Sequence, residues 1–253
     1  MISRVSSADP ASQLVNDQIA PDDGMWDGNP SHYFGVGQSA LHCIKVSMLA
    51  AGIETFTNIL DLPCGHGRVL RHLQHAFPRA QLTACDINMS ATEFCARTFG
   101  ATPVQGHESP GKIALQGNYD LIWVGSLVTH LNAKVCMDFL DIFRANLSRN
   151  GLLVCTIHGR KVADRLRNGV SAYGLDPNAI PDILEQYSQK DFAFCSYPLN
   201  HPKVPGISAD YGISLTSPCW VFSQVARMPD MRLLTYTEKG WDNHHDVVSF
   251  LRE

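Results

Sequence analysis

Short apolar runs alternate with stretches of helical periodicity through the middle of the chain. Five runs are predicted strands: 57–62, 81–86, 102–105, 119–125 and 152–157. The first of them has the apolar composition of a strand that is buried on both faces, and the third is short. Three intervening stretches repeat an apolar residue every three or four positions, as one face of a helix does: 68–77, 90–98 and 133–146. This alternation predicts a doubly wound, mostly parallel α/β sheet with helices on both faces.

The two ends of the chain depart from this rhythm. Residues 1–30 are polar, and helical spacing follows them from about residue 37 to residue 51. After His158, prolines and glycines separate short helical stretches from strand-like runs at 192–197 and 211–215. The close of the chain predicts a helix and two strands that form an antiparallel hairpin: 218–228, 231–237 and 247–251. With that hairpin the predicted sheet has seven strands.

The length of 253 residues suits one α/β domain with an insertion, so we expect a single domain over 1–253. Its parts are expected to follow the changes in rhythm. They are an N-terminal arm and helix that act as a lid, a ligand-binding core, a substrate cover inserted after the fifth strand, and a closing helix with two strands: 1–54, 55–159, 160–217 and 218–253.

Charge and composition narrow the range of partners. The formal net charge is -4 and Lys and Arg form no cluster, so we expect neither nucleic acid nor an anionic membrane as a partner. No run reaches the roughly 18 apolar residues of a membrane span, and the opening MISRVSSADPASQ lacks the apolar stretch of a secretory signal. We therefore expect a cytoplasmic protein that acts on a small molecule. The sequence predicts no particular oligomeric state.

The eight cysteines lie mostly inside apolar runs, such as LTACDI and LLVCTI. A free thiol packs there as a small apolar side chain. No CxxC pair occurs, so we expect neither a disulfide framework nor a structural zinc site. This use of cysteine is typical of a reducing compartment.

The first predicted strand leads into a glycine-rich turn that suits a nucleoside. Gly65 and Gly67 let the backbone bend and let a ligand approach where a Cβ would stand in the way. Asp86 ends the second strand, 19 residues after Gly67, where a carboxylate can accept hydrogen bonds from both ribose hydroxyls. The turn and the carboxylate in one βαβ unit predict a nucleoside site. A tight strand-to-helix connection and a helix-capping carboxylate are the structural alternatives.

The same turn does not fit a dinucleotide. Dinucleotide-binding turns follow GxGxxG, which places a pyrophosphate on the N-terminus of the helix. Here Leu70 stands in place of the third glycine, and its bulk opposes the close packing of helix and strand. A nucleotide-dependent oxidoreductase is therefore a disfavoured alternative.

The run ILDLPCGHGRVLRHL, followed by LTACDIN, resembles the class I S-adenosylmethionine-dependent methyltransferases. Asp61 matches the acidic position of their first motif, and Gly65 and Gly67 match its later glycines. Pro63 stands where the first glycine usually does, which is a departure because proline fixes φ and removes an N–H. Ile87 matches the apolar neighbour of the ribose-binding acid, which packs on adenine in that family.

Further segments extend the resemblance over about residues 55–160, and loosely over 218–253. GHES lies where the family contacts the adenine amino edge, and IWVGSLVTHL matches the motif beside the methionine portion. The resemblance implies S-adenosylmethionine as methyl donor, S-adenosylhomocysteine as product, and this set of cofactor-binding residues: Asp61, Pro63, Cys64, Gly65, Gly67, Arg68, Asp86, Ile87, His107, Glu108, Gly125, Ser126 and Leu127. A narrower likeness is to bacterial methyltransferases that modify small metabolites or sugars.

Methyl transfer from a sulfonium is an SN2 displacement, in which the protein mainly aligns the reactants. A hydroxyl acceptor also needs a base, and histidine suits that role near neutral pH. His130, His158 and His245 stand beside strand ends and are the candidate catalytic residues, with a helix cap, a loop contact and a polar hairpin turn as their alternatives. His245 next to Asp246 also allows an oriented His–Asp pair. A magnesium site formed by His244, His245 and Asp246 is a disfavoured alternative, because magnesium prefers oxygen ligands and the sequence shows no acidic cluster, so we expect no metal site.

Aromatic and polar residues outside the core are the candidate contacts of the acceptor: Trp26, Tyr33, Tyr211, Trp220 and His244. Packing of the arm and of the core is the alternative for each of them. We therefore expect an enzyme that transfers a methyl group from S-adenosylmethionine to an oxygen of a small molecule or sugar. A module that binds S-adenosylmethionine or S-adenosylhomocysteine without turnover is the alternative from another class.

Overall fold

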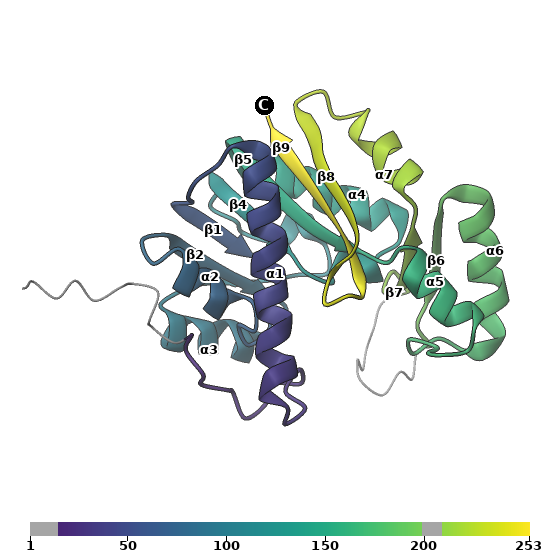
Figure 1. The fold of residues 1–253 in the computed structure, drawn as a ribbon, viewed down its shortest axis with the longest axis horizontal. Coiled ribbons are helices and arrows are strands. Elements are labelled where there is room, and N and C mark those ends of the chain that lie inside the picture. The colour runs from purple at the N-terminus through teal and green to yellow at the C-terminus, as the bar shows by residue number, and fades with distance from the viewer. Residues whose placement is uncertain (1–14, 199–208) are drawn as a thin grey trace, which may run out of the picture.

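A computed structural model describes residues 15–198 and 209–253 of the chain. Its main sheet has seven strands in the order β3-β2-β1-β4-β5-β9-β8 (Figure 1). The strands are β1 (Asn58–Asp61), β2 (Gln81–Asp86), β3 (Thr102–Gln105), β4 (Tyr119–Val124), β5 (Leu147–Ile157), β8 (Met231–Trp241) and β9 (His245–Arg252). The first five are parallel, and β9 runs antiparallel to both β5 and β8. The predicted fold is confirmed.

The order of the strands reverses beside β1. Strand β2 follows β1 on one side, whereas β4 pairs with its other side, so adjacent connections leave the sheet in opposite directions. A crevice opens at such a switch point, outside the carboxyl ends of the strands. Ile59 and Leu60 of β1 are fully buried, because helices cover both faces of this central strand.

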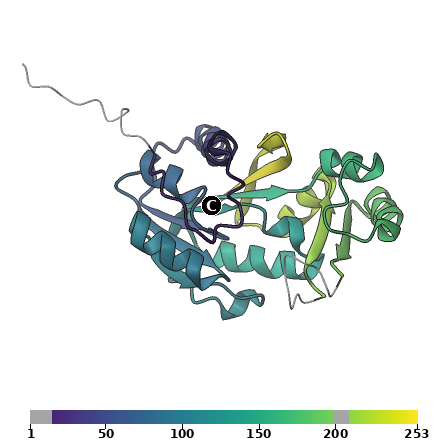
Figure 2. The same cartoon turned by 90° about the horizontal axis from the view of Figure 1, so that it is seen from below.

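Helices cover the two faces of the sheet in two layers. On one face, α1 (Pro30–Ala51), α2 (Leu70–Ala76) and α3 (Met89–Phe99) share a core with the sheet. On the other face lie α4 (Ala133–Asn146) and α7 (Pro218–Val225). Figure 2 shows α1 in dark purple on one side of the strands and α4 in teal on the other. None of the described helices is long and apolar enough to cross a membrane.

Helix α1 starts seven residues before the apolar spacing that predicted it. The side chain of Asn29 accepts a hydrogen bond from the backbone N–H of His32, and Pro30 occupies the first turn. Asparagine at the cap and proline directly after it are a helix-start signal that does not depend on apolar periodicity. Gly52 ends the helix with φ of 69°, in the left-handed region that favours glycine.

The segment after β5 forms a smaller layer beyond the end of the main sheet (Figure 1). It contains α5 (Arg160–Arg167), α6 (Ile180–Lys190) and the antiparallel pair β6 (Phe192–Ser196) and β7 (Gly212–Thr216). The two predicted strands of this segment are confirmed. Its elements bury an apolar cluster of their own that includes Val162, Ile183 and Leu215. Three short 3₁₀ turns complete the described structure: Pro110–Lys112, Val128–His130 and Pro177–Ala179.

Candidate active site

A cavity of about 310 Å³ opens at the switch point, beside the carboxyl ends of β1, β2 and β4. Eight of the residues predicted to bind cofactor or acceptor line it: Pro63, Asp86, Ile87, His107, Glu108, Ser126, Leu127 and Tyr211. The sequence analysis did not identify the residues of its apolar wall, which come from the stretches around η2 (Pro110–Lys112), η3 (Val128–His130) and α4: Ile113, Leu131, Val135 and Phe139. Apolar walls with a few placed polar groups are typical of small-molecule sites.

Asp86 is tied to the glycine turn. One carboxylate oxygen accepts a hydrogen bond from the backbone N–H of Gly65 at 2.8 Å, and the other accepts one from Asn88 N–H at 2.9 Å. Gly106 passes so close that a Cβ there would lie 2.7 Å from the carbonyl carbon of Asp86. The carboxylate is therefore held at the cavity wall by backbone groups, with oxygen lone pairs left for a ribose.

Glycine is required at the two positions of the turn for different structural reasons. Gly65 has φ of 49°, and a Cβ there would meet no atom within 4 Å, so open space lies beside it. Gly67 has φ of 78°, and its Cβ would lie 2.4 Å from the ring of Phe99 in α3. Open space at Gly65 suits a ligand, whereas Gly67 is required for the packing of α3 against the turn.

Asp61 is a buried carboxylate without a partner. It ends β1, is 1% exposed, and neither of its oxygens forms a hydrogen bond with any described residue. Burial raises the pKa of this carboxyl well above its usual range, and the nearby charge of Asp86 raises it further. An unpaired buried carboxylate is costly, and a positively charged ligand group would offset that cost. A cationic group such as the ammonium of S-adenosylmethionine would suit this carboxyl, which is next in sequence to the wall residue Leu62 but does not itself line the cavity.

Other predicted cofactor residues lie in or near the turn but not on the cavity wall as the structure describes it. Cys64 is buried, and the Arg68 guanidinium lies 5.9 Å from the ring centre of Tyr33. A Cβ on Gly125 would lie 2.8 Å from the indole nitrogen of Trp123. Contact of these residues with the cofactor stays a prediction.

The N-terminal arm is fastened over the glycine turn by Arg71, a residue that the sequence analysis missed. Arg71 is fully buried, and its guanidinium donates hydrogen bonds to the backbone oxygens of Asn16 and Gln18 at 2.9 Å each. His66 of the turn lies 3.3 Å from the carboxylate of Asp22. No periodicity distinguishes Arg71 from a surface residue of α2, so the sequence carries no signal for this role.

Two residues predicted to contact the acceptor belong to this arm. Tyr33 is fully buried, and its hydroxyl donates a hydrogen bond to Asp23 at 2.5 Å. The ring of Trp26 packs edge-on against Tyr33, with ring centres 5.5 Å apart. Both residues join the arm to α1, and their contact with an acceptor stays a prediction.

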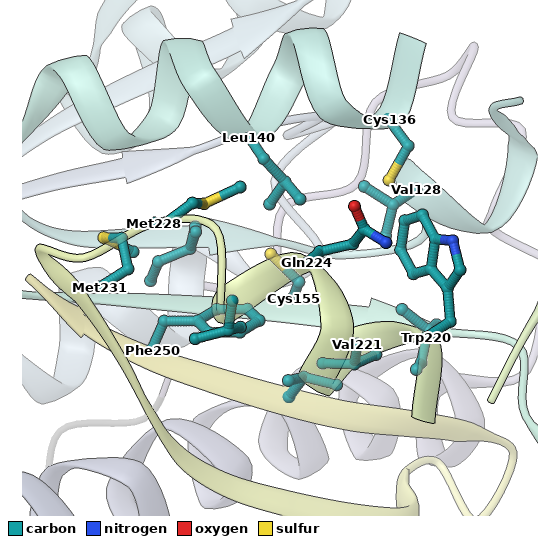
Figure 3. A pocket seen from close by; sticks show the side chains of 14 residues that line it. Val128, Cys136, Leu140, Cys155, Trp220, Val221, Gln224, Met228, Met231 and Phe250 are labelled. Carbon is teal, nitrogen blue, oxygen red and sulfur yellow. The ribbon is translucent and has the colours of Figure 1, made fainter. Parts of the chain in front are cut away.

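A second cavity lies between α4 and α7, on the far side of the sheet from α1 (Figure 3). Its lining is apolar except for Gln224, and Leu140, Met228 and Phe250 point into it. Its volume is about 40 Å³, which is too small for a nucleoside. Trp220 lines this space and packs on Phe192 with ring centres 4.8 Å apart, so its described contacts are those of a core residue.

Four histidines gather where β5 ends and β9 begins, and three of them are the predicted catalytic residues. His158 follows β5 and His245 begins β9, and their Nε2 atoms lie 3.1 Å apart. The ring centre of His130 is 6.0 Å from that of His158, and the ring centre of His244 is 6.2 Å from it. The cluster forms because β9 runs antiparallel to β5, which brings the start of one strand to the end of the other.

His130 has a defined tautomer in this cluster. Its Nδ1 lies 2.8 Å from the backbone oxygen of Gly212, an acceptor only, so Nδ1 carries the proton and donates it. The ring stacks on Tyr211, with ring centres 5.0 Å apart, and Tyr211 also lines the cofactor cavity. Burial lowers the pKa of His130. The ring therefore carries an unprotonated Nε2, and it packs against Tyr211, a residue of the cavity wall.

Burial also keeps the other two candidate bases neutral. It lowers the pKa of His158 well below its usual range, and neighbouring histidines lower it further. Burial, followed by the charge of His244, lowers the pKa of His245 to about 3. His244 is half-buried and stacks on Tyr173 with ring centres 5.7 Å apart.

Comparison with known proteins agrees with this geometry. Residues 60–153 match a family described as a methyltransferase domain. No match was found among curated proteins.

Among solved structures, the chain is similar to a S-adenosylmethionine-dependent methyltransferase from Clostridium acetobutylicum ATCC 824. The two are 10% identical with a TM-score of 0.57, and the match covers 85% of this chain and 91% of that chain. The 1,6-didemethyltoxoflavin-N1-methyltransferase of Burkholderia thailandensis, solved with S-adenosylhomocysteine, is 11% identical with a TM-score of 0.56, covering 88% and 84%. An O-methyltransferase family protein from Burkholderia thailandensis is 10% identical with a TM-score of 0.53, and the chain spans 58% of its length and is itself 87% covered. At these identities the likeness shows the fold alone.

Proposed function

We propose that the chain, whose residues 60–153 match a methyltransferase domain, uses S-adenosylmethionine to methylate an oxygen of a small molecule or sugar, with His130 as general base. The observation that carries the proposal is the hydrogen bond from His130 Nδ1 to Gly212, which leaves Nε2 as a proton acceptor on a ring that stacks on the cavity residue Tyr211. A base held in one tautomer by a backbone carbonyl suits proton removal from a hydroxyl.

In this proposal the cofactor binds in one orientation, with its ribose, its adenine and its cationic end each beside a different group of residues. Asp86 would accept hydrogen bonds from the ribose, and Ile87 with the apolar wall around Phe139 would pack on the faces of the adenine ring. Asp61 is the unpaired carboxylate toward which the cationic end of the cofactor would lie. When bound, S-adenosylmethionine supplies an electrophilic methyl group on a positively charged sulfur.

The roles of the protein are to align the acceptor, to exclude water and to take one proton. Nε2 of His130 would take the hydroxyl proton of the acceptor as its oxygen is methylated, so that no charged alkoxide has to form first. Tyr211 and Tyr197 flank the His130 ring, with ring centres 5.0 and 6.0 Å from it. Aromatic walls on two sides suit a flat phenol or the apolar face of a sugar, and they keep the site dry.

A turnover assay tests this proposal. S-adenosylmethionine with a labelled methyl group would be incubated with the protein and a panel of phenols and sugars, and label in the acceptor would be counted. We expect transfer to at least one hydroxyl acceptor and no transfer to its deoxy analogue. Binding of S-adenosylmethionine without transfer to any acceptor, including amines, would instead favour the non-catalytic binding module. Transfer to amines alone would overturn the assignment of oxygen.

A further inference from the structure

Three imidazoles at the far end of the histidine cluster converge on one point. One ring nitrogen from each of His158, His244 and His245 lies within 4.8 Å of the others. From this convergence we infer that these three histidines bind one divalent transition-metal ion of the zinc class. This inference revises the expectation from the sequence that the chain has no metal site.

One of the separations is already that of two ligands on one small ion. Nitrogens bound at about 2.0–2.1 Å to a tetrahedral ion lie about 3.3 Å apart. The Nε2 atoms of His158 and His245 are 3.1 Å apart. The ring centres of the two pairs that include His245 are 4.8 and 4.9 Å apart. A hydrogen bond between His158 and His245 would explain their pair alone, and it gives no reason for His244 to join them.

His244 is free to complete the set by a small movement. It lies in the turn between β8 and β9, where Asp242 and Asn243 have φ of 52° and 46°. Its ring nitrogen is 3.4 Å from the hydroxyl of Tyr173, which is a long contact for a hydrogen bond to oxygen. His158 and His245 are fixed by the ends of β5 and β9, so the two rigid ligands are already in place and the third lies on a loop.

The donor set selects the kind of metal. Three imidazole nitrogens suit zinc, copper or nickel, whereas magnesium and calcium prefer oxygen. The carboxylate of Asp246 is engaged elsewhere, because its oxygens accept hydrogen bonds from the Tyr236 hydroxyl at 2.7 Å and from the Lys239 N–H at 2.8 Å. Three protein ligands leave the fourth tetrahedral position open, as in catalytic rather than structural zinc sites.

The open coordination position could bind an oxygen of the acceptor. This part of the inference rests on the proposed function. The ring centres of His158 and His130 are 6.0 Å apart, so an acceptor oxygen bound at the fourth position of the metal would lie close to the proposed base. A metal ion lowers the pKa of an oxygen that it binds. Arg165 and Lys161 add positive charge beside His244, and Arg68 adds it beside His245. This surplus favours an anionic fourth ligand, such as a phenolate.

Cobalt titration tests the site without any cofactor or acceptor. The protein would be stripped with a chelator, dialysed, and titrated with Co²⁺ while the visible absorption is recorded. We expect one equivalent to bind with the intense d–d bands of a tetrahedral nitrogen site, and one equivalent of Zn²⁺ to abolish them. His244→Gln and His245→Gln should each weaken Co²⁺ binding by at least about 100-fold, because loss of an outer-shell partner alone costs about 10–100-fold.

A matched control separates this site from casual binding by surface histidines. His42 is exposed on α1, and His42→Gln should bind Co²⁺ as the parent protein does. Zn²⁺ should raise the melting temperature of the parent protein and of His42→Gln but not that of His244→Gln. Absence of saturable Co²⁺ absorption, or equal loss in His42→Gln and His244→Gln, would overturn the inference. S-adenosylhomocysteine binding by the same stripped protein reports separately on the proposed function.

Discussion

The cofactor cavity and the histidine cluster lie side by side at one edge of the sheet, but they are built differently. The cavity takes its polar groups from successive strand ends, and its key contact joins Asp86 to Gly65 through a backbone N–H. The cluster takes its rings from three distant segments, around His130, His158 and His245. The first is a local motif that can be recognised in a sequence. The second exists only because β9 returns beside β5.

The comparison also separates two kinds of buried polar group. Around the cavity and the glycine turn (the cavity half), Asp61 has no partner among the described residues, whereas the guanidinium of Arg71 is hydrogen-bonded and fastens the arm. Around the histidines (the cluster half), His130 bonds a backbone oxygen and His158 pairs with His245, while Nδ1 of His158 has no partner among the described residues. Ligand binding should therefore depend on the first half, and the chemical step on the second.

The largest expected effect is on turnover. His130→Gln removes the proposed base, so turnover should fall by about 100-fold or more at saturating cofactor. Affinity for S-adenosylhomocysteine should stay within twofold of the parent value, and His42→Gln should leave both quantities unchanged. Turnover that survives in a folded His130→Gln protein would contradict the assignment of the chemical step to the histidine cluster.

The two glycines of the turn should respond in opposite ways. Gly67→Ala puts a Cβ 2.4 Å from the Phe99 ring at a φ of 78°, so the free energy of unfolding should fall by about 2–4 kcal/mol. Gly65→Ala has the strain of positive φ without the clash and should lose only about 1–2 kcal/mol. Affinity for S-adenosylhomocysteine should fall more in Gly65→Ala. Urea unfolding and calorimetric titration of both variants measure the two effects, and a reversed order would refute the different reasons given for the glycines.

A third prediction concerns stability against pH in the cavity half. His72 of α2 is buried without a hydrogen-bond partner among the described residues, and burial, aided by the charge of Arg71, lowers its pKa to about 4. The unfolded chain takes up this proton near pH 6.5, so stability falls as the pH drops from about 6.5 to 4, by about 2–3 kcal/mol for this residue. Urea unfolding at pH 7 and pH 5 should show a smaller difference for His72→Leu than for the parent protein. His75→Leu is the control, and an equal pH difference in all three proteins would contradict the assignment.

The smallest expected effect is at the ribose site. Asp86→Ala should weaken S-adenosylhomocysteine binding by about 1–3 kcal/mol, because the ribose hydroxyls and Gly65 N–H lose their acceptor. Asp86→Asn keeps one oxygen of similar shape and should lose less. Equilibrium dialysis with labelled ligand would rank the three proteins. Equal affinity in all of them would remove Asp86 from the ribose site.

Much of the fold could be predicted because its signals are local. The predicted bounds 81–86, 102–105 and 133–146 coincide with β2, β3 and α4. Strand β2 and helix α4 have an apolar pattern of their own, whereas β3 is a short and mostly exposed strand. The prediction for β5 began at Leu152, whereas the strand begins at Leu147. Ser148, Arg149 and Asn150 interrupt the apolar run, and the strand continues through them at the edge of the core.

The candidate site could be predicted only where its residues also have a local signal in the sequence. The polar groups of the cavity follow strand ends, so their positions could be inferred, whereas Ile113 and Val135 of its apolar wall resemble any other core residues. The candidate histidines were identified as residues beside strand ends, but the 3.1 Å approach of His158 to His245 depends on the register of β5 with β9. Register between strands so distant in the chain has no local signal.

The central claim is that the cavity beside Asp86 holds the S-adenosyl group, and calorimetric titration with S-adenosylhomocysteine tests it most directly. We expect one binding site per chain with affinity in the micromolar range, unchanged when NAD is present in excess. No heat of binding, or displacement of S-adenosylhomocysteine by NAD, would contradict the account.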